Sequence, residues 1–416
     1  MTTSDSTAQG AALDHWIDAH FDEEIAFLRE IVRVPSDTPP GDNLPAADRA
    51  AMLLEDIGFV VERHAPPQAA VADAGMRSVV NLVVRQRLGA GGPVIALNVH
   101  GDVVPPGEGW TQDPYGGAVV DGRMYGRGVA VSKSDFATYT FALRALMASG
   151  LPLSGAIELH LTYDEEFGGL LGPAWLLSEG ISKPDLALGP GFSYAVVTAH
   201  NGCLQLAVSI RGRSAHAGMP ETGVDAIRAA HVVMAAIYAD AEQLQKQRSQ
   251  VEGIGSPTLN IGLIEGGINT NVVPDRVTFK LDRRMIPEED PVAVEAALRK
   301  VIAGALPKQQ GLSVDVKQLL LARALKPLPG HERLVEALQA AASDVMGSPI
   351  PATATPLYTD ARLYGEAGIP IVLYGAGPRS ILEANAKRAD ENLVLEDLRI
   401  ATRVVARALA TLLAPR

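Results

Sequence analysis

The spacing of apolar and polar positions along the chain changes near His200. Before it, segments with helical spacing of apolar residues alternate with short apolar runs of strand length. The expected helices span about 11–34, 46–57 and 135–149, and the expected strands span 59–63, 78–85, 94–99 and 156–162. We expect Pro35 to end the first helix. Strands that alternate with helices are typical of an α/β sheet with helices on its faces.

From about residue 200 to residue 321 the expected order is β-α-β-β-α-β, which is that of a ferredoxin-like unit. The strands are expected at 203–211, 258–264, 276–283 and 312–320, and the helices at 224–239 and 292–303. A helix at 329–346, a strand at 369–374 and a helix at 393–413 follow. The sequence therefore predicts a discontinuous mixed-sheet α/β domain of residues 1–199 and 322–416, with an inserted α+β domain over 200–321.

Length and composition restrict the classes of protein that fit. A chain of 416 residues with 47% hydrophobic content is long and apolar enough for two domains. The net charge of −12 argues against a nucleic-acid or membrane-surface partner. The single cysteine, Cys203, excludes an intramolecular disulfide and a cysteine-based metal cluster. The N-terminus does not resemble a leader peptide and no apolar run is long enough for a membrane span, so we expect a cytoplasmic protein.

Two polar motifs follow predicted strands directly. His100-Gly101-Asp102 ends the strand at 94–99, where alternate residues share one side of the pleat, so Asp102 is able to hold one imidazole nitrogen while the other acts as ligand or base. Asp164-Glu165-Glu166 follows 156–162, and adjacent carboxylates repel one another unless a cation or solvent compensates. Ligands in α/β sheets gather at the carboxyl ends of strands. Taken alone, the motifs also fit a core histidine satisfied by Asp102 and a solvated acidic cluster.

The same motifs carry a family resemblance. His100-Gly101-Asp102-Val103-Val104-Pro105, Trp110, Gly126-Arg127-Gly128 and Asp164-Glu165-Glu166 occur in this order along the chain. The sequence resembles the di-zinc amidohydrolase and exopeptidase family that includes acetylornithine deacetylase, succinyl-diaminopimelate desuccinylase, aminoacylase and carboxypeptidase G. The resemblance covers nearly the whole chain. It implies a catalytic domain with an inserted lid and dimerisation domain, so we expect a homodimer formed through the lid.

The resemblance also implies roles for single residues of the catalytic domain. Glu165 corresponds to the general base that activates water. Asp102, two residues after the first metal ligand, His100, is a further catalytic candidate. Glu166 corresponds to a second metal ligand. The turn of Gly375 and Gly377, after the strand at 369–374, is a further candidate because its backbone N–H groups would suit an anion.

Three lid residues match the family's substrate-binding positions. His216 corresponds to a residue that reaches the substrate carbonyl or its oxyanion, often across the dimer. Asn271 and Arg284 correspond to residues that bind the carboxylate of the substrate, which the fork of an arginine suits. A solvated loop histidine and a surface ion pair of Arg284 remain the alternatives.

The metal site departs from the family pattern. The resemblance implies five protein ligands for two Zn²⁺ ions, but Val131 stands where a bridging aspartate is expected and Lys387 where a histidine is expected. No carboxylate follows Pro184-Asp185 up to Gly191, and we expect the helical position of Asp135 to turn it away from the site. A catalytic zinc takes about three protein ligands plus water. With only His100 and Glu166 retained, we expect no Zn²⁺ or one weakly bound ion.

A lysine in the place of a metal ligand changes the expected chemistry. The ammonium of Lys387 would repel a metal ion and neutralise Glu165 and Glu166, although a solvent-exposed lysine that does not align remains an alternative. We predict a hydrolase-family enzyme that acts on an amide, N-acyl or carbamoyl bond of a small carboxylate-bearing amino-acid derivative. A metal-free isomerase or lyase that uses Glu165 and Lys387, and a non-catalytic ligand-binding homologue, stay open as alternatives.

Overall fold

The computed structural model describes residues 3–415, and the chain divides into two compact units. Unit 1 contains the residues up to Thr198, then Pro327–Thr353 and the residues from Thr359 onward. Unit 2 contains Ala199–Lys326 and the short segment Ala354–Tyr358. The sequence pattern does not indicate that this short segment returns to unit 2. No helix in the part of the chain that the structure describes is long and apolar enough to cross a membrane.

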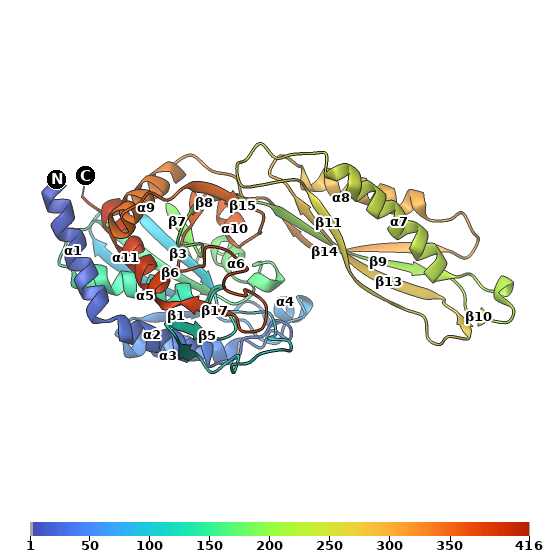
Figure 1. The fold of residues 1–416 in the computed structure, drawn as a ribbon, viewed down its shortest axis with the longest axis horizontal. Coiled ribbons are helices and arrows are strands. Elements are labelled where there is room, and N and C mark those ends of the chain that lie inside the picture. The colour runs from blue at the N-terminus through green and yellow to red at the C-terminus, as the bar shows by residue number, and fades with distance from the viewer. Residues whose placement is uncertain (1–2, 416) are drawn as a thin grey trace. The chain divides into compact units, whose positions relative to one another are not determined.

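The centre of unit 1 is a mixed sheet of eight strands (Figure 1). In sheet order these are β1 (Val61–His64), β2 (Asn81–Gly89), β6 (Gly155–Thr162), β3 (Val94–His100), β7 (Leu186–Gly189), β16 (Ile371–Leu373), β8 (Val196–His200) and β15 (Ala352–Thr355). The neighbours β6, β3, β7 and β16 run parallel, whereas β1 is antiparallel to β2, β2 to β6, and β8 to β16. The predicted mixed α/β fold is therefore confirmed.

Helices cover the sheet of unit 1 and bury its apolar side chains. They are α1 (Thr3–Ala19), α2 (Phe21–Val32), α3 (Leu44–Asp56), α4 (Gln68–Asp73), α5 (Lys133–Ala148), α6 (Pro173–Ser178), α9 (His331–Met346), α10 (Ala361–Glu366) and α11 (Leu395–Leu412). Helix α5 contacts β3 and β6, α11 packs against α5 and α9, and α10 contacts β7 and β16. Strands β3 and β6 are buried over almost their whole length, which is typical of parallel strands covered on both faces. This burial fixes the carboxyl ends of both strands.

The first predicted helix is wrong in one respect. The segment 11–34 lies in two helices, because the chain turns at His20, whose ring stacks on Trp16 and whose Nδ1 is 2.7 Å from the carbonyl oxygen of Trp16. Ile17 and Phe21 on either side of the turn are both buried in the same core. Apolar spacing reports the buried face, so it continues through the turn and does not reveal it.

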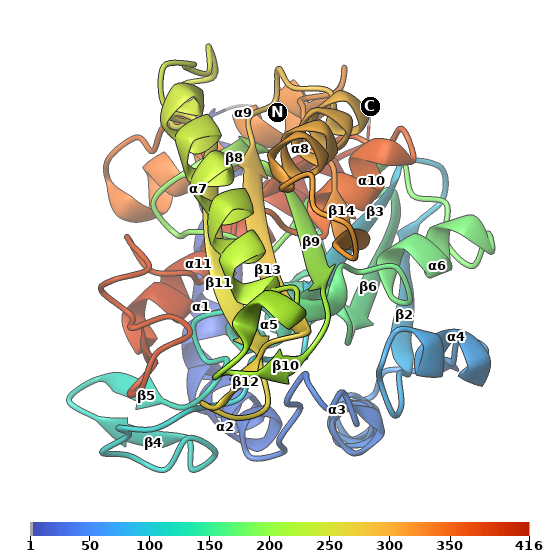
Figure 2. The ribbon, with the colours of Figure 1, turned by 90° about the vertical axis from the view of Figure 1, so that its right-hand side faces the viewer.

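Unit 2 contains a four-stranded antiparallel sheet in the order β11-β13-β9-β14. The strands are β9 (Gly202–Arg211), β11 (Thr258–Gly266), β13 (Arg276–Met285) and β14 (Ser313–Ala322), and the helices α7 (Ala226–Leu244) and α8 (Pro291–Ala305) lie over one face of the sheet (Figure 2). Asp225 and Asp290 begin the two helices by accepting the backbone N–H groups of Arg228 and Ala293. This is the ferredoxin-like order of the predicted inserted domain.

Candidate active site

The two polar motifs lie at the same edge of the sheet in unit 1. Strands β3 and β6 are parallel neighbours, and His100 pairs in register with Thr162, two residues before Asp164. His100 is 5% exposed, and its Nδ1 is 3.0 Å from the backbone oxygen of Asp102 and 3.5 Å from Oδ1 of the same residue. Burial alone would lower the pKa of His100, but the negative charges of Glu165 and Asp102 raise it to about 10.

Asp102 holds the acidic segment in place. Its Oδ1 accepts the backbone N–H of Glu165 at 3.2 Å, and its Oδ2 accepts that of Glu166 at 3.0 Å. The side chain is fully buried, and the two bonds begin the short 3-10 helix η1 (Glu165–Phe167). A carboxylate at the start of a helical turn satisfies N–H groups that have no partner within the turn. Asp102 therefore fixes the backbone from which the Glu165 and Glu166 side chains project.

The two glutamates have different surroundings. The carboxylate of Glu165 has no hydrogen-bond partner among the described residues, although the residue is only 7% exposed. Glu166 pairs with Lys387, whose Nζ lies 2.8 Å from Oε2. The Lys387 side chain is 48% exposed and therefore reaches this carboxylate from the solvent side. Burial raises the pKa of Glu166 to about 7, against the opposing effect of the Lys387 charge.

One buried carboxylate, Glu391, connects the segment of Val131 to the segment of Lys387. Its Oε1 accepts the backbone N–H groups of Ala130 at 3.1 Å and Val131 at 3.2 Å. Its Oε2 accepts the N–H of Lys387 at 3.3 Å and a bond from the Arg127 guanidinium, which is also buried. Val131 and Lys387, two of the three positions at which this sequence lacks a metal ligand that the resemblance implies, therefore share one anchor.

Asp360 is a buried acid of this region that the sequence interpretation missed. It is 4% exposed, and a Cβ atom on Gly169 would lie 2.1 Å from its Oδ1, so it packs directly against the loop that follows η1. Arg362 donates a hydrogen bond to Gly168 in the same loop. Burial and the negative charges of Glu165 and Asp164 hold the pKa of Asp360 well above its usual range. In the sequence Asp360 only precedes a short helix, a pattern that does not signal burial.

Asp135 is engaged with the end of β16. Its Oδ1 accepts the N–H of Ala376 at 2.8 Å, and a Cβ atom on Gly375 would lie 2.2 Å from the same oxygen. Burial raises the pKa of Asp135 to about 7. The N–H of Gly377 donates to Gly191 at 2.9 Å, so the expectation that Gly377 offers this group to an anion is wrong.

In unit 2, two of the predicted substrate-binding residues lie near each other and the third lies apart. The N–H of Ala217, next to His216, donates to the carbonyl of Asn271 at 3.0 Å, and both His216 and Asn271 are exposed. Arg284 pairs in register with Cys203 at the beginning of β9, whereas His216 follows the end of β9. A strand of 10 residues spans roughly 30 Å, so His216 and Arg284 lie at opposite ends of the sheet.

Arg284 is oriented by its own strand. Its Nε donates to Oδ1 of Asp282 at 2.7 Å, its guanidinium lies 5.2 Å from the ring centroid of Tyr358, and its side chain is 31% exposed. Because Asp282 holds one edge of the Arg284 guanidinium, the remaining N–H groups of Arg284 keep a defined direction.

Few donor atoms of this region suit the two Zn²⁺ ions that the resemblance implies. No group of three or more His, Cys, Asp or Glu side chains within residues 3–415 is arranged to hold a metal ion. Val131 offers no donor atom, and the Lys387 ammonium contacts one of the two retained ligands. A Cβ atom on Gly191 would lie 2.7 Å from the backbone nitrogen of Tyr374, so no carboxylate side chain fits at that position without a shift of the backbone. Val131, Lys387 and Gly191 therefore offer neither a carboxylate nor an imidazole at the three positions where the resemblance implies one.

Comparison with known proteins identifies the family. The model of peptidase family M20/M25/M40 matches residues 96–411. A succinyl-diaminopimelate desuccinylase from Rhodospirillum centenum is 28% identical, over 90% of this chain and 94% of its own length. An acetylornithine deacetylase from Myxococcus xanthus is 28% identical, over 92% of this chain and 96% of its own. The solved structure of a dipeptidase from Saccharomyces cerevisiae has a TM-score of 0.79 at 15% identity, covering 98% of this chain and 99% of its own. The chain therefore belongs to peptidase family M20/M25/M40 and is an amidohydrolase of that family.

Proposed function

We propose that this amidohydrolase cleaves an amide, N-acyl or carbamoyl C–N bond in a small amino-acid derivative that carries a carboxylate, and that it does so with no Zn²⁺ or with one weakly held ion. The observation that supports the proposal is the arrangement at the end of β6. Asp102 fixes the backbone of Glu165 and Glu166, Glu165 has a carboxylate without a partner among the described residues, and Lys387 places an ammonium on Glu166.

The proposed reaction uses groups of this chain alone. Glu165 takes a proton from water as the water oxygen bonds to the carbonyl carbon, and then gives that proton to the leaving nitrogen as the C–N bond breaks. Lys387 uses one of its three N–H groups on Glu166 and retains donors for the negative charge that develops on the carbonyl oxygen. A fixed cation of this kind supports the reaction of an activated C–N bond better than that of an ordinary peptide bond, because an ammonium polarises a carbonyl less than a zinc ion.

The lid residues support a carboxylate-bearing substrate and a homodimer. Arg284 suits a carboxylate, and His216 suits a developing oxyanion. Because these two residues lie roughly 30 Å apart on one lid, a single lid cannot give both to one small substrate, and a second copy of the chain would supply the other. Strand β11, at an edge of the lid sheet, exposes Leu263 and Ile264, and exposed apolar side chains on an edge strand are suited to pairing between copies.

An isomerase or lyase is the second candidate, because the same pair of groups is a base and an acid within one site. Glu165 would remove a proton and Lys387 would donate one, with no water consumed. The ion pair of Lys387 with Glu166 favours this candidate as much as hydrolysis, so the products of the reaction must distinguish the two. A homologue that binds ligand without turnover is the third candidate.

The proposal is tested by metal content and by turnover of a panel of N-acyl and carbamoyl amino acids, with and without added zinc. Protein purified without chelator should contain well under one zinc per chain, and Glu165→Gln should abolish turnover while substrate affinity changes by less than about threefold. Glu179→Gln, at an exposed position after α6, is the matched control and should keep full activity.

Several outcomes would contradict these proposals. Two tightly bound zinc ions per chain would refute the proposed metal site, and unchanged turnover in Glu165→Gln would remove Glu165 from its role. A product with the same mass as the substrate would show that the reaction is an isomerisation and not a hydrolysis. No turnover of any panel member, together with saturable binding, would favour the non-catalytic homologue.

A further inference from the structure

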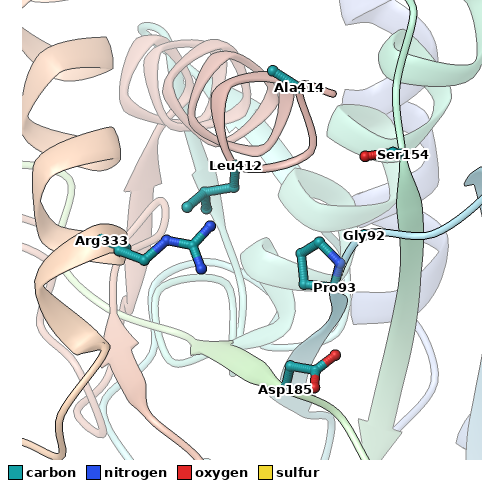
Figure 3. Close-up of a pocket in the computed structure, with 7 residues that line it drawn as sticks. All are labelled: Gly92, Pro93, Ser154, Asp185, Arg333, Leu412 and Ala414. Atoms are coloured by element: carbon teal, nitrogen blue, oxygen red, sulfur yellow. The ribbon is translucent and has the colours of Figure 1, made fainter. Parts of the chain in front are cut away.

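Unit 1 contains a cavity of about 460 Å³ at the edge of the sheet opposite to the candidate active site. It is lined by Gly92, Pro93, Ser154, Asp185, Arg333, Leu412 and Ala414 (Figure 3). Pro93, Ser154 and Asp185 directly precede β3, β6 and β7, whereas His100 is the last residue of β3 and Glu165 follows β6. The seven residues of β3 therefore separate the cavity from the candidate active site by roughly 20 Å. Its volume lies within the usual range of small-molecule sites, about 300–1,000 Å³.

Arg333 provides a positive charge that nothing in the described chain neutralises. It lies in the first turn of α9 and is exposed, and it has no hydrogen bond or ion pair with any residue that the structure describes. In Figure 3 its guanidinium extends into the cavity toward Pro93 and Leu412. The guanidinium has five N–H donors in a fork that matches a carboxylate. Because its donors are unused, Arg333 is available to a ligand.

Asp185 provides a fixed negative charge on another wall of the same cavity (Figure 3). Its Oδ2 accepts the N–H of Val94 at 2.8 Å, and its own backbone N–H donates to the carbonyl of Val94 at 2.8 Å, so the side chain is held at the beginning of β3. The second oxygen, Oδ1, has no hydrogen-bond partner among the described residues, and Asp185 forms no ion pair with Arg333. The two opposite charges face one cavity without neutralising each other.

The remaining wall is mainly apolar. Pro93, Leu412 and Ala414 contribute hydrocarbon, and Ser154 contributes one hydroxyl. We propose that the cavity binds a free α-amino acid with an apolar side chain, whose carboxylate bonds to Arg333 and whose ammonium bonds to Asp185. A ligand with a single charge would leave either the Asp185 carboxylate or the Arg333 guanidinium unused. An amino-acid zwitterion with an apolar side chain matches both charges and the apolar wall. The proposal goes beyond the catalysed reaction and does not depend on it.

The test is calorimetric titration of the full-length chain with L-leucine, compared with two analogues that each lack one charge. These are 4-methylpentanoate, which has no amine, and L-leucinamide, which has no carboxylate. L-Leucine should bind saturably with a Kd on the order of 1 mM, and each analogue should bind at least about tenfold more weakly. If neither L-leucine nor L-valine binds saturably at concentrations up to 20 times this expected Kd, the proposal is overturned.

Matched variants assign the binding to this cavity. Arg333→Gln and Asp185→Asn should each weaken L-leucine binding at least about tenfold, and the asparagine keeps an oxygen that accepts the N–H of Val94. Arg77→Gln removes an exposed arginine that does not line the cavity and should leave L-leucine binding unchanged. Unchanged binding in Arg333→Gln, or loss of binding in Arg77→Gln, would place the amino acid elsewhere and overturn the proposal. Near-ultraviolet circular dichroism of each variant confirms that a loss of binding is not a loss of fold.

Discussion

Glu24 is a buried acid whose ionisation should make the stability of unit 1 depend on pH. It lies on α2, is fully buried, and its only hydrogen-bond partner among the described residues is the Thr402 hydroxyl of α11, at 2.6 Å. That hydroxyl is also 3.0 Å from the carbonyl of Leu398, and it has a single hydrogen. A protonated Glu24 donates to the hydroxyl, which then donates to Leu398, so the neutral acid satisfies both groups. Burial raises the pKa of Glu24 to about 8.

The sign and size of the effect follow from this pKa. An unfolded chain ionises Glu24 near its ordinary value of 4.5, whereas the folded chain keeps it protonated up to about pH 8. The folded state therefore binds more protons in this window, and the contribution of Glu24 to stability is lost as the pH rises from 4.5 to about 8. At about 1.4 kcal/mol for each pKa unit, the loss is about 3 kcal/mol at pH 7 and about 5 kcal/mol well above pH 8.

Glu24→Gln removes this ionisation and keeps the shape and hydrogen-bonding capacity of the side chain. The variant should be more stable than the parent chain by about 3 kcal/mol at pH 7 and nearly equal to it at pH 4.5. Urea unfolding followed by tryptophan fluorescence is a suitable assay, because all three tryptophans, Trp16, Trp110 and Trp175, belong to unit 1. Asp22→Asn, at an exposed position in the same first turn, is the control and should differ by less than about 0.5 kcal/mol at every pH. A constant difference between Glu24→Gln and the parent chain from pH 5 to pH 8 would refute the reasoning.

Three further substitutions follow from the site. Asp102→Asn exchanges one acceptor oxygen for an N–H donor, so one of the two backbone hydrogen bonds that begin η1 is lost. The kcat should fall about 100-fold. A decrease of less than twofold would argue against the positioning role of Asp102. Glu391→Ala leaves the Arg127 charge buried without its partner, so it should lower the free energy of unfolding, measured by urea titration, by about 3–5 kcal/mol. Glu396→Ala, on the exposed side of α11, is the control and should leave the free energy of unfolding nearly unchanged. Gly375→Ala places a Cβ against the Asp135 carboxylate and should lower the thermal midpoint by several degrees, which calorimetry would measure; an unchanged midpoint would contradict the close contact.

The sequence predicted the elements that position the site because their signals are local. Apolar runs of strand length ended at His100 and before Asp164, and parallel neighbours in a sheet bring such ends together. The ferredoxin-like order of unit 2 also followed from local periodicity. The turn at His20 was missed because both helices bury the same face, and β7 was missed because its four residues are too short to distinguish from a loop.

The contacts within the site could not be predicted because they join residues far apart in sequence. Glu391 accepts bonds from Ala130 and Val131, more than 250 positions away, and no local pattern reveals such a partner. The burial of Asp360 depends in the same way on packing against the loop of Gly169. Gly377 was expected to present its N–H to an anion, but the residue that accepts this N–H, Gly191, lies on a different strand connection.

The anchor formed by Glu391 has a consequence for how this site changes through evolution. The peptide groups of Val131 and Lys387 attach to the same carboxylate, so their positions are inherited as a pair whatever side chains they carry. Substitutions at both positions therefore change the side-chain chemistry while the backbone keeps its attachment to Glu391. Metal-ligand side chains introduced at both places would start from backbone positions that Glu391 already holds.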